Sequence, residues 1–224
     1  MKGLIDVQKG TAGKKDAVTI VVIALKLLVI CAVVALLVAS VNHITKDKIT
    51  HNQMLKTASA LSNIYSENGM FFSVNENGQY TISDINGNPL GSCDTADIQL
   101  LENIDTLYII KNTDASVFGY CACASPMGFK NEVSMLVAVN PDGSAKGVEI
   151  ISLSDTKGIG DKVKNADFLD KFKGKTFGFS SNASDMSEII IAGATRTSEP
   201  VTKAVDTVLI QVSKLINGGA VNEQ

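Results

Sequence analysis

The sequence is poor in several residues that carry common chemistry. It has no tryptophan and only 5% aromatic residues, which argues against an aromatic platform for stacking bases. Charged residues make up 19% of the chain and the net charge is −3. This balance is too mild for a nucleic-acid binder, and the charge is too low for a disordered chain. The mean hydropathy of +0.18 is nevertheless high for a soluble domain, so one segment must be unusually apolar.

Histidine and cysteine are also scarce. The two histidines, His43 and His51, flank the end of an apolar segment and are expected near a membrane interface, so a catalytic triad has almost no material. The four cysteines are Cys31 in the apolar segment, Cys93 in an expected loop, and Cys121 and Cys123 on an expected strand. Alternation places Cys121 and Cys123 on one face, as a thiol pair or half of a metal site. We favour small packing residues, because no C-x-x-C and no histidine completes a ligand set.

The apolar segment covers residues 17–41, with Lys26 as its one charge. A helix of this length spans about 37 Å, enough for a hydrocarbon core of about 30 Å. We therefore expect a transmembrane helix rather than a buried core helix. A cleaved signal peptide is the alternative, because Val38-Ala39-Ser40 resembles a cleavage site. The run is longer than the apolar core of about 7–15 residues in such signals, which favours an uncleaved anchor.

The two sides of this segment differ in charge. Residues 1–16 carry four lysines against two aspartates, whereas residues 42–224 carry 15 basic against 21 acidic residues. The positive-inside rule counts the basic residues near the span, and Lys46 and Lys48 beyond it make the asymmetry modest. The pattern predicts a single-pass protein of the cell membrane, with the segment 1–16 in the cytoplasm and the larger part outside.

The remainder is expected to form a helical stalk at residues 42–65, one domain at residues 66–217, and a tail at residues 218–224. Turn-forming residues alternate with β-branched runs in its first part. Short strands are expected at 70–74 and 80–82, and longer strands at 106–111, 116–124, 133–139 and 145–153. Asn140-Pro141-Asp142-Gly143 is expected to join the last two strands in a hairpin.

Helical periodicity appears later in the chain. Helices are expected at 163–172 and at 197–216, the second with Ser198 as N-cap and Pro200 in its first turn. Strands with flanking helices predict an α+β fold, in which a single N-terminal transmembrane helix precedes an antiparallel-sheet domain.

The segment Ile189–Ser198, I-I-I-A-G-A-T-R-T-S, has the pattern of an anion site. An apolar, strand-like run ends at Gly193, where the backbone can approach a ligand closely, and a helix begins within a few residues. Thr195 and Thr197 offer hydroxyl groups, and the helix N-terminus favours a phosphate. Arg196, the only arginine, lies between them and is expected by default to form a surface salt bridge. A plain strand–helix turn is the alternative.

The letters A-G-A-T-R-T-S resemble the S/T-G-A-T-x-T-S motif of the FMN-binding domain family, found in the RnfG protein of the Rnf complex and the NqrC protein of the Na⁺-translocating NADH:quinone reductase. In that family a flavin transferase esterifies the threonine of G-A-T to the phosphate of FMN. The resemblance implies covalent FMN on Thr195. It places further binding residues at Gly193, Ala194, Thr197 and Ser198. Ala192 departs from the family's Ser or Thr, and Ile189, next to Glu188, stands where an acid is common.

A second family segment, S-E-T-P-G-L-G, is similar to residues 154–160, S-D-T-K-G-I-G. The resemblance implies that FMN is also bound by Thr156, Lys157, Gly158, Ile159 and Gly160. Lys157 replaces a proline of the family and either stabilises a reduced, anionic flavin or is a solvated loop lysine. A looser third likeness lies at Gly119-Tyr120 and Gly128-Phe129. The resemblance covers about residues 106–216.

The resemblance implies a subunit of a membrane-bound, ion-translocating ferredoxin:NAD⁺ oxidoreductase that carries electrons on covalent FMN. The flavin supplies the redox chemistry, so neither a catalytic residue nor a metal is expected of this chain. The sequence has no G-x-G-x-x-G and no cysteine spacing typical of an iron–sulfur cluster. Expected partners are the other subunits of the complex, the lipid bilayer and a flavin transferase, and no nucleic acid.

Two alternatives remain. The first is the FMN-bearing subunit of a Na⁺-translocating NADH:quinone reductase, which the short chain and short cytoplasmic lead make the weaker choice. The second is a flavin-free, membrane-anchored extracytoplasmic binding or scaffold module, in which the G-A-T turn serves only to begin a helix.

Overall fold

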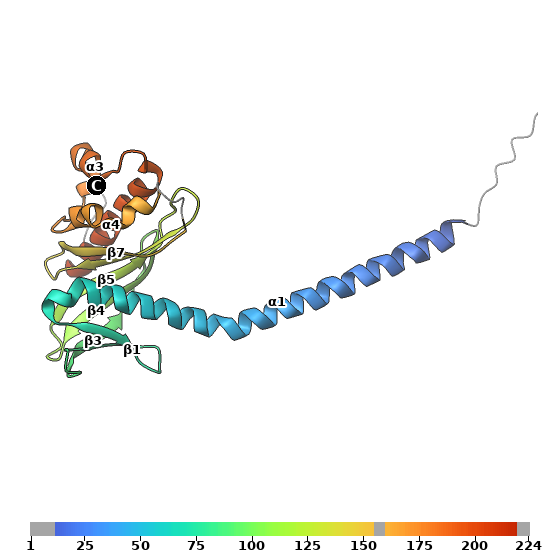
Figure 1. Ribbon diagram of the computed structural model, residues 1–224, viewed down its shortest axis with the longest axis horizontal. Helices are drawn as coiled ribbons and strands as arrows, with labels where there is room; N and C mark the ends of the chain where they lie inside the picture. Colours follow the sequence, from blue (N-terminus) through green and yellow to red (C-terminus); the bar gives the residue numbers. More distant parts are fainter. Residues whose placement is uncertain (1–11, 155–159, 219–224) are drawn as a thin grey trace, which may run out of the picture. The chain divides into compact units, whose positions relative to one another are not determined.

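A computed structural model describes residues 12–154 and 160–218, with side chains from residue 18 (Figure 1). The chain divides into two compact units, residues 1–51 and residues 52–224. Helix α1, Ala12–Tyr65, contributes to both.

The first unit consists, in its described part, of α1 alone. Its apolar side chains are exposed on every side of the helix, among them Val18, Ile20, Val21, Leu25, Leu28, Val33, Leu36 and Leu37. A helix that is apolar all round requires an apolar surrounding, and its length and composition suffice to cross a membrane. Among the described residues it is the one helix of this kind, which fits a single-pass membrane protein.

The second unit is built on a seven-stranded antiparallel sheet in which every strand pairs with its neighbours in sequence. The strands are β1 (Phe71–Val74), β2 (Tyr80–Ser83), β3 (Pro89–Thr95), β4 (Ile104–Asn112), β5 (Val117–Ala124), β6 (Val133–Val139) and β7 (Ala145–Leu153). The predicted α+β class is confirmed, and β6 and β7 coincide with the expected strands.

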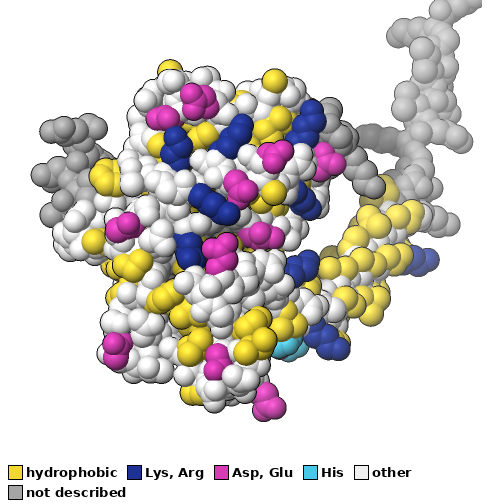
Figure 2. All heavy atoms as spheres, turned by 60° about the vertical axis from the view of Figure 1, so that its left-hand side comes forward, with side chains coloured by type: hydrophobic (Ala, Val, Ile, Leu, Met, Phe, Trp, Pro, Cys, Tyr) yellow, Lys and Arg dark blue, Asp and Glu magenta, His cyan; other side chains and the backbone are white. Residues whose placement is uncertain are grey.

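Short helices and one long helix follow the sheet. They are η2 (Gly160–Lys164), α2 (Ala166–Leu169), η3 (Asp170–Phe172), η4 (Phe179–Ser181), α3 (Ala183–Ile189) and α4 (Thr195–Ile216), while η1 (Ser66–Asn68) ends the α1 region. Acidic and basic side chains are interspersed on the face of this unit that Figure 2 presents, in keeping with the mild net charge.

Both faces of the central strands are buried. In β6, Val133, Met135, Val137 and Val139 point to one face and pack with α4, whereas Leu136 and Ala138 point to the other and pack with the last turns of α1. Successive side chains of a strand point to opposite faces, so a nearly continuous apolar run such as β6 can fill two cores at once. The sheet is therefore covered by α1 on one face and by α4 on the other.

Helix α4 is amphipathic, and its apolar stripe explains its position. Val201, Val205, Val208, Leu209 and Val212 are fully buried against the sheet. At its C-terminal end, a Cβ on Gly143 of the β6–β7 turn would lie 3.6 Å from Cδ1 of Ile216. The N-terminus of α4 therefore lies toward the opposite end of β6, beside the β5–β6 hairpin tip.

Four expectations are wrong in detail. The strand-like run before Gly193 is the end of helix α3, whose Asn182 N-cap accepts a hydrogen bond from the Ser184 amide. Three isoleucines in a row fit either a strand or a buried helix end. The helix expected at 163–172 is divided by Asn165, whose backbone is extended.

The third and fourth errors concern β3, which was not expected and which contains Cys93. The strand is polar and half exposed, so it lacks an apolar pattern. A Cβ on its Gly91 would lie 1.9 Å from the Lys111 carbonyl oxygen, so the close pairing with β4 requires glycine here.

Candidate functional site

The turn before α4 is held by backbone and side-chain bonds around Gly193. Gly193 has a φ of +78°, and the amide of Ala194 donates to the carbonyl of Ile191 at 2.9 Å. Ser198 Oγ accepts from the Ile191 amide at 3.1 Å and donates to the Ala194 carbonyl, also at 3.1 Å. Ser198 therefore fixes the turn from inside the helix.

Two predicted details of this helix start are wrong. The N-cap residue is Ala194, not Ser198, and it offers no side-chain cap. The helix begins at Thr195, so Pro200 is its sixth residue and lies beyond the first turn. Because proline has no N–H, the Arg196 carbonyl lacks its α-helical donor.

The hydroxyl groups of the motif differ in accessibility. Thr195 is exposed, whereas Thr197 and Ser198 are only 1% and 0% exposed. Within the described part of the chain, Thr195 Oγ1 forms no side-chain hydrogen bond. The amides of Thr197 and Ser198 donate to the Ala194 carbonyl, which leaves those of Thr195 and Arg196 as the first free donors of the helix. Thr195 is thus a free nucleophilic oxygen beside two free N–H groups.

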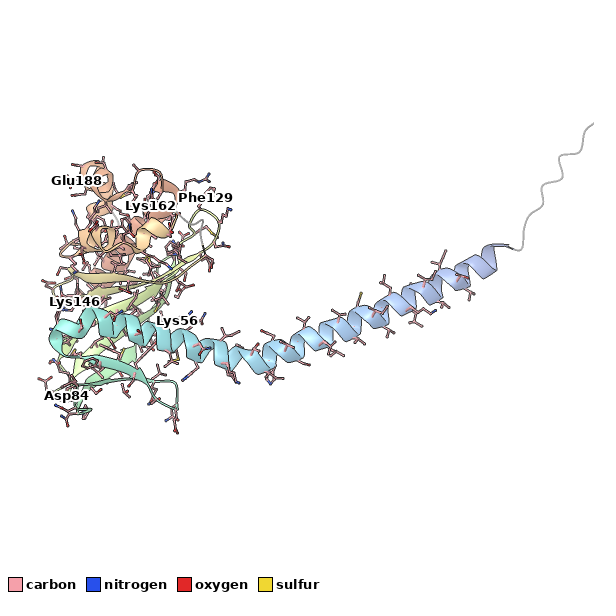
Figure 3. All side chains as sticks on the ribbon, in the orientation of Figure 1. Lys56, Asp84, Phe129, Lys146, Lys162 and Glu188 are labelled. Carbon is pink, nitrogen blue, oxygen red and sulfur yellow. The ribbon has the colours of Figure 1, made fainter. Side chains whose placement is uncertain are left out.

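The tip of the β5–β6 hairpin contacts the start of α4. The tip is closed by a bridge between Met127 and Glu132 and by a 2.9 Å bond from the Gly128 amide to the Asn131 carbonyl. Phe129 projects from it with 44% of its surface exposed (Figure 3). The guanidinium carbon of Arg196 lies 5.1 Å from the centre of the Phe129 ring, within the range of a cation–π contact.

The segment of the second family motif borders the same place. Thr156, Lys157, Gly158 and Ile159 lie outside the described residues. Of the two ends that are described, Ser154 accepts a 2.7 Å hydrogen bond at its carbonyl from the side-chain amide of Asn131. Gly160 is buried and opens η2, whose Val163 packs in the same core as Val201 of α4. The three segments with family likeness, around residues 128, 154 and 195, therefore converge.

A groove runs along α4 from this point. It has a volume of about 300 Å³ and lies between the helix, at Glu199, Pro200 and Lys203, and the segments of Met127 and Asn103. An ion pair of 2.8 Å joins Lys203 to Glu199 within it.

The cysteines lie on the other face of the sheet. Cys93, Cys121 and Cys123 all belong to or border the core beneath α1. Burial raises the pKa of Cys93 to about 12 and that of Cys123 to about 11, and it holds the pKa of Cys121 well above its usual value. These thiols are therefore protonated at neutral pH and weakly reactive. In the described ranges, no group of three or more His, Cys, Asp or Glu side chains could hold a metal ion.

Sequence reasoning missed Asn131 and Asp206. The carboxylate of Asp206, in α4, accepts hydrogen bonds from the Gly178 amide at 2.6 Å and from both the amide and the hydroxyl of Ser180. A single Asn in a turn and a single Asp on a helix carry no pattern that marks such long-range partners.

Comparison with protein families agrees with the resemblance found in the sequence. Residues 14–64 match the RnfG N-terminal region, and residues 128–210 match the FMN-binding domain. The second match contains the hairpin tip, the second motif and the G-A-T turn. The resemblance drawn from the sequence is confirmed.

Known proteins with similar sequences are subunits of membrane complexes. The G subunit of the proton-translocating ferredoxin:NAD(+) oxidoreductase complex of Clostridium ljungdahlii is 32% identical over 44% of this chain and 56% of its own length. The G subunits of the ion-translocating oxidoreductase complex from Shewanella amazonensis and Erwinia tasmaniensis are 27% and 24% identical. Those matches cover 79% and 94% of this chain, and 80% and 98% of the relatives.

Among solved structures, NqrC of Shewanella oneidensis matches with a TM-score of 0.38 and 20% identity. The match covers 54% of this chain and 69% of that one.

Proposed function

We propose that this chain, which carries the RnfG N-terminal region and the FMN-binding domain, is the membrane-anchored, electron-carrying subunit of an ion-translocating ferredoxin:NAD⁺ oxidoreductase complex. The observation that carries the proposal is the start of α4. There the G-A-T threonine is exposed, free of hydrogen bonds among the described residues, and surrounded by the other family segments. The relatives named as G subunits of such complexes support the same function.

The FMN is attached through a phosphate ester at Thr195 Oγ1. The free amides of Thr195 and Arg196 and the positive end of the helix dipole favour the phosphate there. Gly193 and Ala194 place the backbone of the turn at the same point, whereas the burial of Thr197 keeps its hydroxyl away from a flavin transferase. Bound in this way, FMN supplies the redox chemistry, and the chain supplies attachment and orientation.

The flavin domain lies outside the cytoplasm, and the chain joins the other subunits through its place in the membrane. The basic segment 1–16 supports a cytoplasmic N-terminus, with residues 17–41 crossing the lipid bilayer and residues 42–65 linking the anchor to the domain. A covalent ester would prevent the loss of a flavin on that side by diffusion.

The test is flavin fluorescence of the full-length chain on a denaturing gel after co-expression with a flavin transferase. We expect a fluorescent band that disappears in Thr195→Ala and persists in Thr207→Ala, a threonine of the same helix. A fluorescent band that survives Thr195→Ala would refute the attachment site. A colourless wild-type chain, made with the transferase, would favour the flavin-free scaffold. Neighbouring genes would distinguish an Rnf complex from a quinone reductase.

A further inference from the structure

Arg196 is held in an uncommon position for an exposed arginine. It is the only arginine of the chain, and its guanidinium carbon lies 5.1 Å from the centre of the Phe129 ring. Within residues 18–154 and 160–218 it forms no ion pair, so the expected surface salt bridge is not present there. A cation over an aromatic face is attracted to the ring without being neutralised. The positive charge of Arg196 therefore remains available to a ligand.

The position of this pair relative to Thr195 is defined by the helix and the hairpin. Arg196 directly follows Thr195. Pro200 and Lys203 come four and seven residues later and therefore share its side of the helix. Both line the groove of about 300 Å³ along α4, and Met127 on the opposite wall is two residues from Phe129. The Arg196–Phe129 pair thus stands between the proposed attachment residue and the groove.

We infer that the Arg196–Phe129 pair positions the isoalloxazine ring of the FMN on Thr195, and that Arg196 raises the flavin potential by stabilising the negative charge of the reduced ring. The inference rests on the proposed function. Reduction by two electrons and one proton leaves the ring with one negative charge. A planar guanidinium with several N–H donors matches the nitrogen and carbonyl oxygen that carry this charge. Phe129 holds the guanidinium in place and offers an apolar surface to the ring.

The experiment uses the full-length, flavinylated chain in detergent. A denaturing gel first establishes that Arg196→Gln, Arg196→Lys and Phe129→Leu carry flavin as the wild type does. Spectroelectrochemical titration then gives the midpoint potential. We expect Arg196→Gln to disfavour the reduced form about tenfold, which lowers the potential of a two-electron couple by about 30 mV. Arg196→Lys is expected to recover part of the shift, and Phe129→Leu to show a smaller shift in the same direction.

The pH dependence of the potential provides a second measurement that a merely structural role would not change. A nearby cation lowers the pKa of the reduced ring, so its removal in Arg196→Gln moves the break in the potential–pH curve to higher pH. The matched control is Lys111→Gln, which also removes one positive charge. Lys111 lies eight residues along β4 from Asn103 at the groove, about 26 Å at the rise of an extended strand. We expect this control to leave both the potential and the break unchanged.

The outcomes separate the inference from the function on which it rests. Flavin on the wild-type chain, with Arg196→Gln and the control giving the same potential and the same break, would overturn the inference alone. A shift in Lys157→Gln without one in Arg196→Gln would also overturn it, since the charge would then come from the second motif. A wild-type chain without flavin on Thr195 would overturn the proposed function and this inference with it.

Discussion

The side-chain amide of Asn131 donates a 2.7 Å hydrogen bond to the carbonyl oxygen of Ser154. This bond ties the tip of the β5–β6 hairpin to the end of β7, where the second family segment begins. Asn131→Ala should lower the free energy of unfolding by about 0.5–1.5 kcal/mol, the usual value of one such bond. It should also reduce flavin attachment, because it releases the hairpin tip that carries Phe129. Urea denaturation and gel fluorescence measure the two effects.

The control for this prediction is Asn112→Ala. Its side-chain amide donates a 2.8 Å bond to Ser116 Oγ in the β4–β5 turn, at the other end of the strands. Flavin attachment should be unaffected in Asn112→Ala. Equal losses of flavin in both variants would show that the Asn131 bond has no special place in the site.

Asp206 binds the segment before α3 to α4 through a buried carboxylate. It is 2% exposed and accepts hydrogen bonds from the backbone of Gly178 and from both the backbone and the side chain of Ser180. Asp206→Asn should lower the free energy of unfolding by about 2–3 kcal/mol, since its NH₂ group must face an N–H donor instead of accepting from it. Circular dichroism during urea denaturation measures this loss.

Asp185→Asn is the comparison for Asp206. Its carboxylate forms a half-exposed ion pair of 3.0 Å with Lys175, worth less than about 1 kcal/mol. If the two substitutions cost the same, the Asp206 bonds do not stabilise the domain as argued.

The sequence was sufficient for those elements whose apolar pattern is complete. Residues 133–139 and 145–153 were predicted to the residue, because a β-branched run bounded by an Asn-Pro-Asp-Gly turn has few other solutions. Polar β3 was missed, since its place in the sheet depends on pairing with β4 through Gly91 and not on burial. The isoleucine run before Gly193 was misassigned because tertiary packing, not local pattern, decides between a strand and a helix end.

Prediction of the site followed the same division. The motif around Thr195 and its place at a helix start were evident from local sequence, although the helix begins two residues earlier than expected. The contact of Arg196 with Phe129 and the bond from Asn131 join residues far apart in the chain, so one sequence held no signal for them. The limits of the membrane span at residues 17 and 41 stay predictions.

Acid should weaken the turns of the sheet. The carboxylate of Asp142, in the β6–β7 turn, accepts hydrogen bonds from the hydroxyl and the amide of Ser144, and these bonds lower its pKa below the usual value. A folded-state pKa below the unfolded one stabilises the fold above the unfolded pKa, and this contribution is lost as the pH falls through the folded pKa. The urea midpoint should therefore fall below about pH 4. Asp142→Asn should reduce this dependence, and an identical pH profile in the variant would contradict the assignment.

Gly193 should be required both for the fold and for flavin attachment. Its φ of +78° is strained for residues with a Cβ, although the space around that position is open. Gly193→Ala should therefore cost about 1–2 kcal/mol through backbone strain alone, and Gly193→Asn less, because asparagine tolerates this region. Gly174, with a φ of +75° and equally open space, provides a matched control far from Thr195 in sequence. Gly174→Ala should lose similar stability and keep its flavin, whereas Gly193→Ala should lose flavin as well, because the turn that presents Thr195 is displaced. If flavin attachment followed stability alone, the two alanine variants would show the same fluorescence on a denaturing gel, and the geometry of the turn would have no separate role.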